Sequence, residues 1–307
     1  MTEPEPEIPM LAPPIPRYDR VHEQTDFRPV VDPVPFVLFE NALAQSSLSY
    51  GSRDLLRALL RSGRPKVFGG GGLGLDYAAL FKTASRPDLL GRHITEVANH
   101  LNANGVDLLV VPGMSGYPIG AMYSQASRIP AVLLKKQTNE DPGLEVPPGS
   151  FLIPSYTGDT DTLISADMDA VQSIIDDIVI HQISAQANSE TLSIEICIAG
   201  ADEIIDKATM ATAVTETAPI FVRTAVETAL TRNVDRIAGR AVAVDIRVVA
   251  WVTPIIKTYN RSNDLLRERF GITPFAGLSL NALQLEPPAV GIEGLGVVSF
   301  YPRDGAQ

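Results

Sequence analysis

The residues best suited to chemistry lie in one stretch, residues 200–214, which reads GADEIIDKATMATAV. Two neighbouring acids, Asp202 and Glu203, directly follow an apolar run at residues 192–199 that has the pattern of a strand entering a sheet. Two like charges at a strand end repel each other, so their presence needs an explanation. One interpretation is a ligand site, and the other is an acid pair that water solvates.

The stretch continues as a polar loop and then as a helix. Asp206 and Lys207 lie in the loop, and the Ala/Thr/Val-rich residues that follow predict a helix beginning near Thr209. Proteins built from alternating strands and helices bind ligands at the carboxyl ends of their strands. The order of strand, polar loop and helix therefore favours a ligand site here.

A βαβ unit precedes this stretch. VDLLVVP is typical of a buried strand, GMSGYPIG of a tight glycine-rich loop, and PAVLLKK of a second buried strand that follows a short helix. The alternation continues along the chain and predicts an α/β fold, a mostly parallel sheet with helices on both faces. We expect the ligand cleft where its strands end, near Val111, Leu134 and Ala201.

The remaining segments organise the chain around that core. Residues 1–35 are rich in proline and are predicted to form an extended or disordered arm, followed by one domain over residues 36–307. Residues 172–191 and 211–238 have helical patterns and are interpreted as insertions. Residues 137–155 form a long polar segment with Pro and Gly, which is interpreted as a mobile lid.

Composition limits the possible functions. A chain of 307 residues with 45% hydrophobic and 20% charged residues can bury a full core. Its net charge of -11 disfavours nucleic acids and anionic membranes as partners. The single cysteine, Cys197, cannot form an internal disulfide and fits a reducing compartment. No membrane span or signal peptide is predicted, so we expect a cytoplasmic protein.

Four segments together resemble the type I phosphoribosyltransferases, most closely the adenine and xanthine branch, over about residues 66–285. GGGGLGLDYAALFKTASRPDLLGRHITEVANHL is similar to the family segment that leads into the first core helix. DLLVVPGMSGYPIGAMYSQASRIPAVLLKK has the layout of strand, diphosphate loop, helix and strand with a basic pair at its end. SYTGDTDTLISADMDAV resembles the hairpin behind the catalytic loop, and ADEIIDKATM resembles the signature for the diphosphate sugar.

The resemblance implies a purpose for the acids. Phosphoribosyl diphosphate (PRPP) brings a ribose with two vicinal hydroxyls, a 5′-phosphate and a magnesium-bound diphosphate. Asp202 and Glu203 would accept hydrogen bonds from the 2′- and 3′-hydroxyls and stabilise positive charge at C1, with Asp206 as a third catalytic acid. Mg²⁺ is the implied cofactor, and it would reach Asp202 and Glu203 only indirectly, through PRPP.

The resemblance also implies which residues contact phosphate. The 5′-phosphate would bind the start of the helix and the loop before it, at Lys207, Ala208, Thr209 and Met210. The diphosphate would lie against the earlier glycine-rich loop, at Gly113, Met114, Ser115 and Gly116, with counter-charge from Lys135 and Lys136.

Departures from the family pattern leave two functions open. The phosphate loop has Lys207 and Ala208 where the family has Thr-Gly-Gly-Thr or Thr-Gly-Lys-Thr, and alanine restricts backbone that glycine leaves free. The first hypothesis is an enzyme that transfers a phosphoribosyl group from PRPP to a purine or purine-like base and releases diphosphate. The second is a non-catalytic regulatory protein that binds PRPP or a nucleotide. The resemblance implies PRPP and a nucleobase as partners, and a homodimer.

Overall fold

The computed structural model describes residues 16–17, 36–67, 73–81, 87–113, 115–137, 148–154 and 161–301. In chain order its elements are α1 (Phe36–Gln45), α2 (Tyr50–Ser62), β1 (Arg64–Val67), β2 (Leu73–Asp76), α3 (Ala78–Phe81), α4 (Pro87–Ala103), β3 (Leu108–Pro112), α5 (Tyr117–Ser127), β4 (Ala131–Gln137), β5 (Phe151–Pro154), β6 (Asp161–Ser165), α6 (Met168–Ala185), β7 (Thr191–Ala201), β8 (Ile204–Ile205), α7 (Thr209–Arg232), α8 (Val234–Ile237), β9 (Ala241–Lys257), η1 (Thr258–Asn260), α9 (Ser262–Phe270), β10 (Phe275–Gln284), β11 (Ala289–Ile292) and β12 (Gly296–Ser299). Most of the predicted arm and lid lie outside the described residues.

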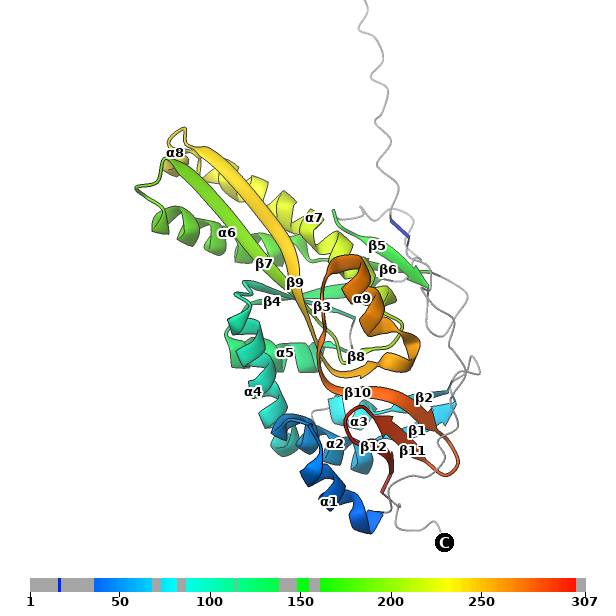
Figure 1. Ribbon diagram of the computed structural model, residues 1–307. Helices are drawn as coiled ribbons and strands as arrows, with labels where there is room; N and C mark the ends of the chain where they lie inside the picture. Colours follow the sequence, from blue (N-terminus) through cyan, green and yellow to red (C-terminus); the bar gives the residue numbers. More distant parts are fainter. Residues whose placement is uncertain are drawn as a thin grey trace, which may run out of the picture.

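A mixed sheet forms the centre of the molecule (Figure 1). Among the described residues its ten strands follow the order β12-β11-β10-β9-β7-β3-β4-β6-β5, with β8 paired to β9. The inner strands β10, β9, β7, β3 and β4 run parallel to one another. Antiparallel strands extend the sheet on both sides, β11 and β12 on one and β6 and β5 on the other. The predicted α/β fold is confirmed.

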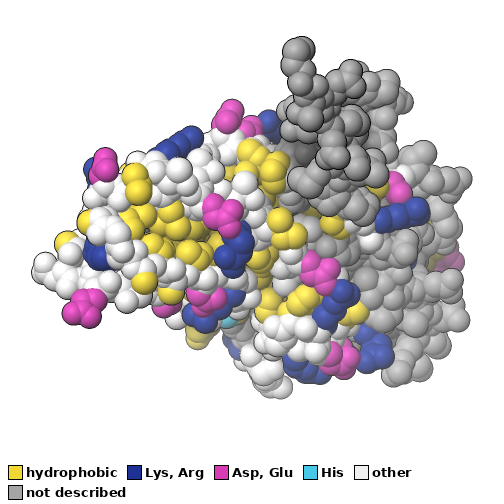
Figure 2. Space-filling model, turned by 90° about the horizontal axis from the view of Figure 1, so that it is seen from above, with side chains coloured by type: hydrophobic (Ala, Val, Ile, Leu, Met, Phe, Trp, Pro, Cys, Tyr) yellow, Lys and Arg dark blue, Asp and Glu magenta, His cyan; other side chains and the backbone are white. Residues whose placement is uncertain are grey.

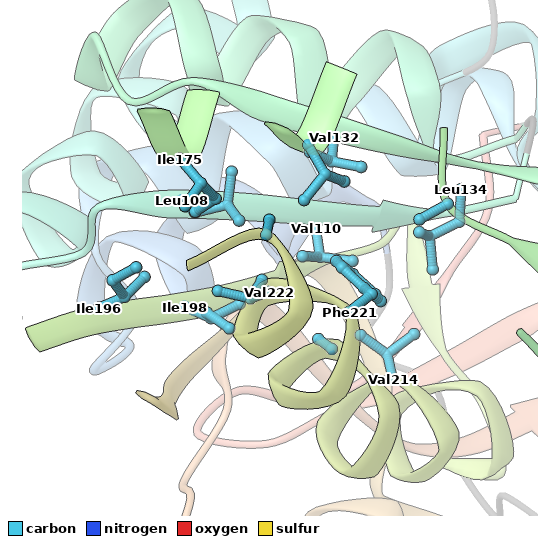
Figure 3. Packing of buried hydrophobic residues seen from close by; sticks show 14 of the residues in the cluster. Leu108, Val110, Val132, Leu134, Ile175, Ile196, Ile198, Val214, Phe221 and Val222 are labelled. Atoms are coloured by element: carbon cyan, nitrogen blue, oxygen red, sulfur yellow. The ribbon is translucent and has the colours of Figure 1, made fainter. Parts of the chain in front are cut away.

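Helices cover both faces of the sheet because successive strand residues point to opposite sides. Leu108 and Val110 of β3 pack with residues of α6 and α7, as Figure 3 shows from close by. Leu109 and Val111 of the same strand pack with residues of α4 and α5 on the other face. A third cluster joins α1, α2 and α3 to β10, β11 and β12. No helix in the described part of the chain is long and apolar enough to cross a membrane.

Strands β7 and β9 continue well beyond their other neighbours. β3 meets β7 only at residues 198–200, whereas β9 runs beside β7 from Thr191 to Ala201. The parts that project past β3, residues 191–197 of β7 and 241–247 of β9, are called the extension below. In Figure 1 the extension points to the upper left, with α6 and α7 along it and α8 at its tip. α6 and α7 also pack against each other.

The extension is joined to the sheet centre where Trp251 of β9 lies opposite Gly200 of β7. The Trp251 side chain is fully buried, and its Nε1 donates a hydrogen bond of 2.9 Å to Thr215 Oγ1 on α7. A Cβ atom on Gly200 would lie 2.4 Å from Trp251 Cε2. Glycine at position 200 therefore lets one indole ring tie together two strands and a helix.

Gly200→Ala is predicted to destabilise the protein by about 1–3 kcal/mol, because the added methyl group must displace a fully buried ring. Chemical denaturation, followed by the fluorescence of the single tryptophan, measures the change in the free energy of unfolding. Gly91→Ala is the control, since a Cβ there meets nothing within 4 Å and alanine favours the interior of α4. Equal losses in both variants would contradict the proposed role of the Trp251 contact.

Candidate functional site

The strand order reverses between β3 and β7. From β3 the chain passes through α5 to β4 on one side, and it returns through β5, β6 and α6 to β7 on the other. Open α/β sheets bind ligands in the crevice at the carboxyl ends of the strands where this reversal occurs. Here those ends are Pro112 of β3 and Ala201 of β7, as the sequence pattern predicts. β4 continues past Leu134 to Gln137 because its last residues pair with antiparallel β6.

The loops after β3 and β7 touch each other. Gly116 is buried, and a Cβ atom on it would lie 3.0 Å from Asp202 Oδ1 and 3.4 Å from Glu203 Oε2. Gly113, at the start of the first loop, has φ of +76°, a conformation that favours glycine. Ser115 is partly buried, and Met114 lies outside the described residues. The structure therefore brings the first loop directly onto the acid pair.

The two acids share a partly enclosed environment. Asp202 Oδ1 accepts a hydrogen bond of 2.9 Å from the backbone N–H of Glu203. Burial, and then the neighbouring Glu203 carboxylate, raise the pKa of the Asp202 carboxyl well above its ordinary value. The Glu203 side chain is buried, and its Oε2 has no hydrogen-bond partner in the described part of the chain. A buried acceptor without a donor is costly, so the pair is suited to a ligand that supplies hydroxyl donors.

The helix predicted near Thr209 begins there. Ala208 precedes it with φ of +57°, and no side chain caps the helix. The first backbone N–H groups of a helix lack partners within the helix, and together with its dipole they attract anions. Thr212 Oγ1, in the first turn, is buried and unpaired among the described residues. The start of α7 thus offers donors within a few residues of the acid pair.

Asp206 is already paired within the protein. Its Oδ2 lies 2.7 Å from Lys257 Nζ, and its Oδ1 accepts a hydrogen bond from Asn260 Nδ2. Lys257 is almost completely buried, at 3% exposure. This contact joins the loop after β7 to the carboxyl end of β9 and holds Asp206 in place. Its role as a third catalytic acid stays a prediction. Lys257 and Asn260 were missed from sequence, although Lys257 ends an apolar strand just as Asp202 follows one.

The remaining predicted basic residues are arranged differently. Lys135 lies within β4 and forms an ion pair of 2.6 Å with Asp167, at the start of α6. Lys136 is exposed on the same strand, and Lys207 is partly buried in the loop before α7. Tyr117, which was not predicted, donates a hydrogen bond to Leu134 O and ties the start of α5 to β4. No described contact joins Lys135 or Lys136 to the acid pair.

The site offers few groups for a metal ion. Within the described ranges, no three His, Cys, Asp or Glu side chains are grouped so that they could hold one. Asp202 and Glu203 supply two carboxylates, which are hard oxygen ligands. Mg²⁺ commonly binds through one or two carboxylates together with substrate phosphates and water. The residues present therefore fit a magnesium ion that arrives with a phosphorylated ligand.

Comparisons with known proteins give structural matches only. No family model and no curated protein matches the chain. Adenine phosphoribosyltransferase from Saccharomyces cerevisiae, complexed with an imino-altritol bisphosphate and adenine, is 14% identical with a TM-score of 0.45, covering 74% of this chain and 98% of its own. The Rhodothermus marinus adenine enzyme is 16% identical with a TM-score of 0.44, covering 74% and 98%.

Orotate phosphoribosyltransferase from Aeropyrum pernix is 10% identical with a TM-score of 0.37, covering 75% of this chain and 93% of its own. All three proteins are phosphoribosyltransferases.

Asp202→Asn is predicted to stabilise the protein increasingly as the pH rises from about 5 to 8. The folded-state pKa of Asp202 is raised, so the folded protein holds this proton more tightly than the unfolded chain and loses stability as the carboxyl ionises. The asparagine side chain does not ionise, so Asp202→Asn removes this loss of stability. We expect the gain in Tm to be larger at pH 8 than at pH 5. Thermal melts across this range measure it, with Asp177→Asn on the exposed side of α6 as the control for the lost charge. A gain independent of pH would contradict the prediction.

Ala208→Gly is predicted to stabilise the protein by about 0.5–1 kcal/mol. A left-handed conformation costs alanine roughly 1–2 kcal/mol, which exceeds the extra unfolded-state entropy that glycine brings. Ala211→Gly, three residues later within α7, is expected to cost about 1 kcal/mol because its backbone is helical. Urea denaturation of both variants should give changes of opposite sign. A loss in both would show that position 208 does not favour glycine.

Proposed function

We propose that the protein binds PRPP in the crevice at the carboxyl ends of β3 and β7 and transfers its phosphoribosyl group to a purine or purine-like base. The observation that carries the proposal is the contact between the Asp202–Glu203 pair and Gly116 at the reversal of strand order. A buried carboxylate oxygen without a donor, a glycine of the first loop that lies against the acids, and the uncapped start of α7 occur at this crevice. A phosphorylated sugar has hydroxyl groups that can donate to the carboxylate oxygen and phosphate groups that can bind the loop and the helix start.

The acid pair is assigned to the ribose. Asp202 and Glu203 accept hydrogen bonds from the 2′- and 3′-hydroxyls, and the unpaired Glu203 Oε2 gains a donor. The bond between C1 and the diphosphate oxygen breaks with its electron pair leaving on the diphosphate, and a ring nitrogen of the base bonds to C1 and loses its proton to solvent. Positive charge develops on C1 and the ring oxygen during this exchange, and the nearby carboxylates stabilise it.

The loops are assigned to the phosphates. The backbone at the start of α7, over residues 207–210, binds the 5′-phosphate, and Lys207 adds a positive charge. Gly113, Ser115 and Gly116 let the backbone of the first loop approach the diphosphate closely. Lys135 and Lys136 contribute positive charge beside the crevice as β4 ends, and Asp206, held by Lys257 and Asn260, keeps the loop in place.

Mg²⁺ fits the site as a companion of the substrate. When bound to the diphosphate, it neutralises negative charge and makes diphosphate a better leaving group. Asp202 and Glu203 would interact with this ion through PRPP, since the described residues contain no complete set of metal ligands. Asp202 and Glu203 orient the ribose whether or not they also interact with the ion.

Calorimetric titration of PRPP in the presence of Mg²⁺ tests the binding step. Glu203→Gln and Asp202→Asn each remove a carboxyl group that would accept a hydrogen bond from the ribose, and they are predicted to weaken binding by about 1.5–3 kcal/mol, or roughly tenfold to a hundredfold. Asp177→Asn removes an exposed carboxylate from α6 and should leave the affinity unchanged. If both site variants bind PRPP as tightly as the parent protein, the acids do not hold the ribose.

Diphosphate release measured with a panel of purine and pyrimidine bases tests the transfer step. Release with a purine, and its loss in Glu203→Gln, would support the enzyme. Binding of PRPP by the parent protein without release from any base would replace the enzyme with the regulatory protein that the sequence left open. No binding of PRPP at millimolar concentration would reject both.

A further inference from the structure

β9 has a free edge along the extension. On one side it pairs with β7 from Ala241 to Val252, and on the other β10 pairs with it only from Val252 onwards. In the described part of the chain, no strand covers the second side between Ala241 and Trp251, and no hydrogen bond beyond the β7 ladder reaches its backbone from Ala241 to Val249. Alternate N–H and C=O groups along this edge therefore have no partner strand among the described residues, and such an edge is a template for another strand.

The two faces of this edge differ in character. Val242, Val244, Ile246 and Val248 are only partly buried and pack at the margin of the core beneath α7. Partly buried Leu230, Ile237 and Phe270 lie at the margin of the same core. Figure 2 shows hydrophobic side chains gathered over this part of the molecule, seen from above. A long edge strand with an apolar margin is uncommon in a protein that stays monomeric, because it invites strand pairing.

The opposite face of the edge carries one charge of each sign. Asp245 and Arg247 are exposed at 56% and 58%, and Arg247 Nη1 lies 3.3 Å from Asp245 Oδ2. In an antiparallel pair, residues directly opposite each other share a face. The register of β9 against β7 shifts at Val249, so the regular part of the free edge runs from Ala241 to Val248. A two-fold axis at Ile246 pairs residues 244–248 of this part with the same residues of a second copy.

That register is also the one in which the charges match. With the axis at Ile246, Asp245 lies opposite the partner's Arg247, and Arg247 lies opposite the partner's Asp245. An axis at Asp245 would place two aspartates together, and an axis at Arg247 would place two arginines together. Opposite charges across a strand pair stabilise it and like charges destabilise it, so the edge is complementary to itself in one register.

We propose that a second copy of this chain docks on the free edge of β9 in antiparallel orientation, with a two-fold axis at Ile246, and joins the two sheets into one. The pairing satisfies the free backbone groups of both edges. It also brings the two apolar margins together beneath the α7 helices, Val244 opposite the partner's Val248. This proposal is independent of the proposed transferase activity.

Sedimentation velocity of the full chain over a range of micromolar concentrations tests the proposal through charge reversal. Asp245→Arg and Arg247→Asp each create two like-charge pairs across the axis, so each is expected to raise the dimer dissociation constant about tenfold or more. The double variant Asp245→Arg/Arg247→Asp restores both pairs and should return it to within about threefold of the parent. Asp245→Arg raises the net charge and Arg247→Asp lowers it. An effect of net charge alone would therefore shift their dimer dissociation constants in opposite directions.

Cross-linking tests the axis itself. In a Cys197→Ser background, Ile246→Cys places the two introduced thiols opposite each other, and a short thiol-specific cross-linker should couple them. Val244→Cys in the same background is the matched control, because its copies lie four residues out of register and should not couple. A chain that is monomeric throughout overturns the proposal. A dimer that resists charge reversal and leaves Ile246→Cys uncoupled overturns it equally, since its interface then lies elsewhere.

Discussion

The contact between Trp251 and Gly200 is the constraint on which the site depends. The indole ring lies where the side chain of residue 200 would be, one residue before the strand end that leads into Asp202, and it donates to Thr215 on α7. One buried ring thereby sets the positions of β7, β9 and α7 relative to one another. The acids follow β7 and the uncapped helix start belongs to α7, so both parts of the site are positioned by this packing.

The site itself is built from unfavourable local features. Two acids lie together, one buried carboxylate oxygen lacks a donor, and alanine adopts a left-handed conformation at the start of α7. Each feature costs stability, and the surrounding sheet and the partly buried Lys257–Asp206 pair hold them in place. A ligand with hydroxyl and phosphate groups would offset the cost of the paired acids and of the carboxylate oxygen that lacks a donor. Such local cost within a well-packed fold is typical of a binding site.

Along the extension, β9 presents a backbone edge that no described strand covers. β9 pairs with β10 only from Val252 onwards and has a free edge from there back to Ala241, whereas its other side pairs with β7 apart from a register shift at Val249. Natural proteins often protect such edges with charged side chains or with proline. Here the charges have both signs and are spaced two residues apart around Ile246. With this spacing, opposite charges meet when the two-fold axis is at Ile246, and like charges meet when it is at Asp245 or Arg247.

The sequence by itself determined the alternation of strands and helices, because hydrophobic periodicity and glycine stops are local. Strand ends followed by polar residues were sufficient to locate the acid pair, the glycine-rich loop and the helix start at Thr209. The same signal would have found Lys257 had it been applied to the strand ending there.

Only the tertiary structure decided how these parts meet. Which strands are neighbours, and therefore that Gly116 lies against Asp202 and Glu203, depends on pairing between residues far apart in the chain. The engagement of Asp206 by Lys257 and Asn260 and the pairing of Lys135 with Asp167 depend on the same long-range geometry. The free edge of β9 was likewise invisible, because an edge strand and a central strand share one local pattern and differ only in their neighbours.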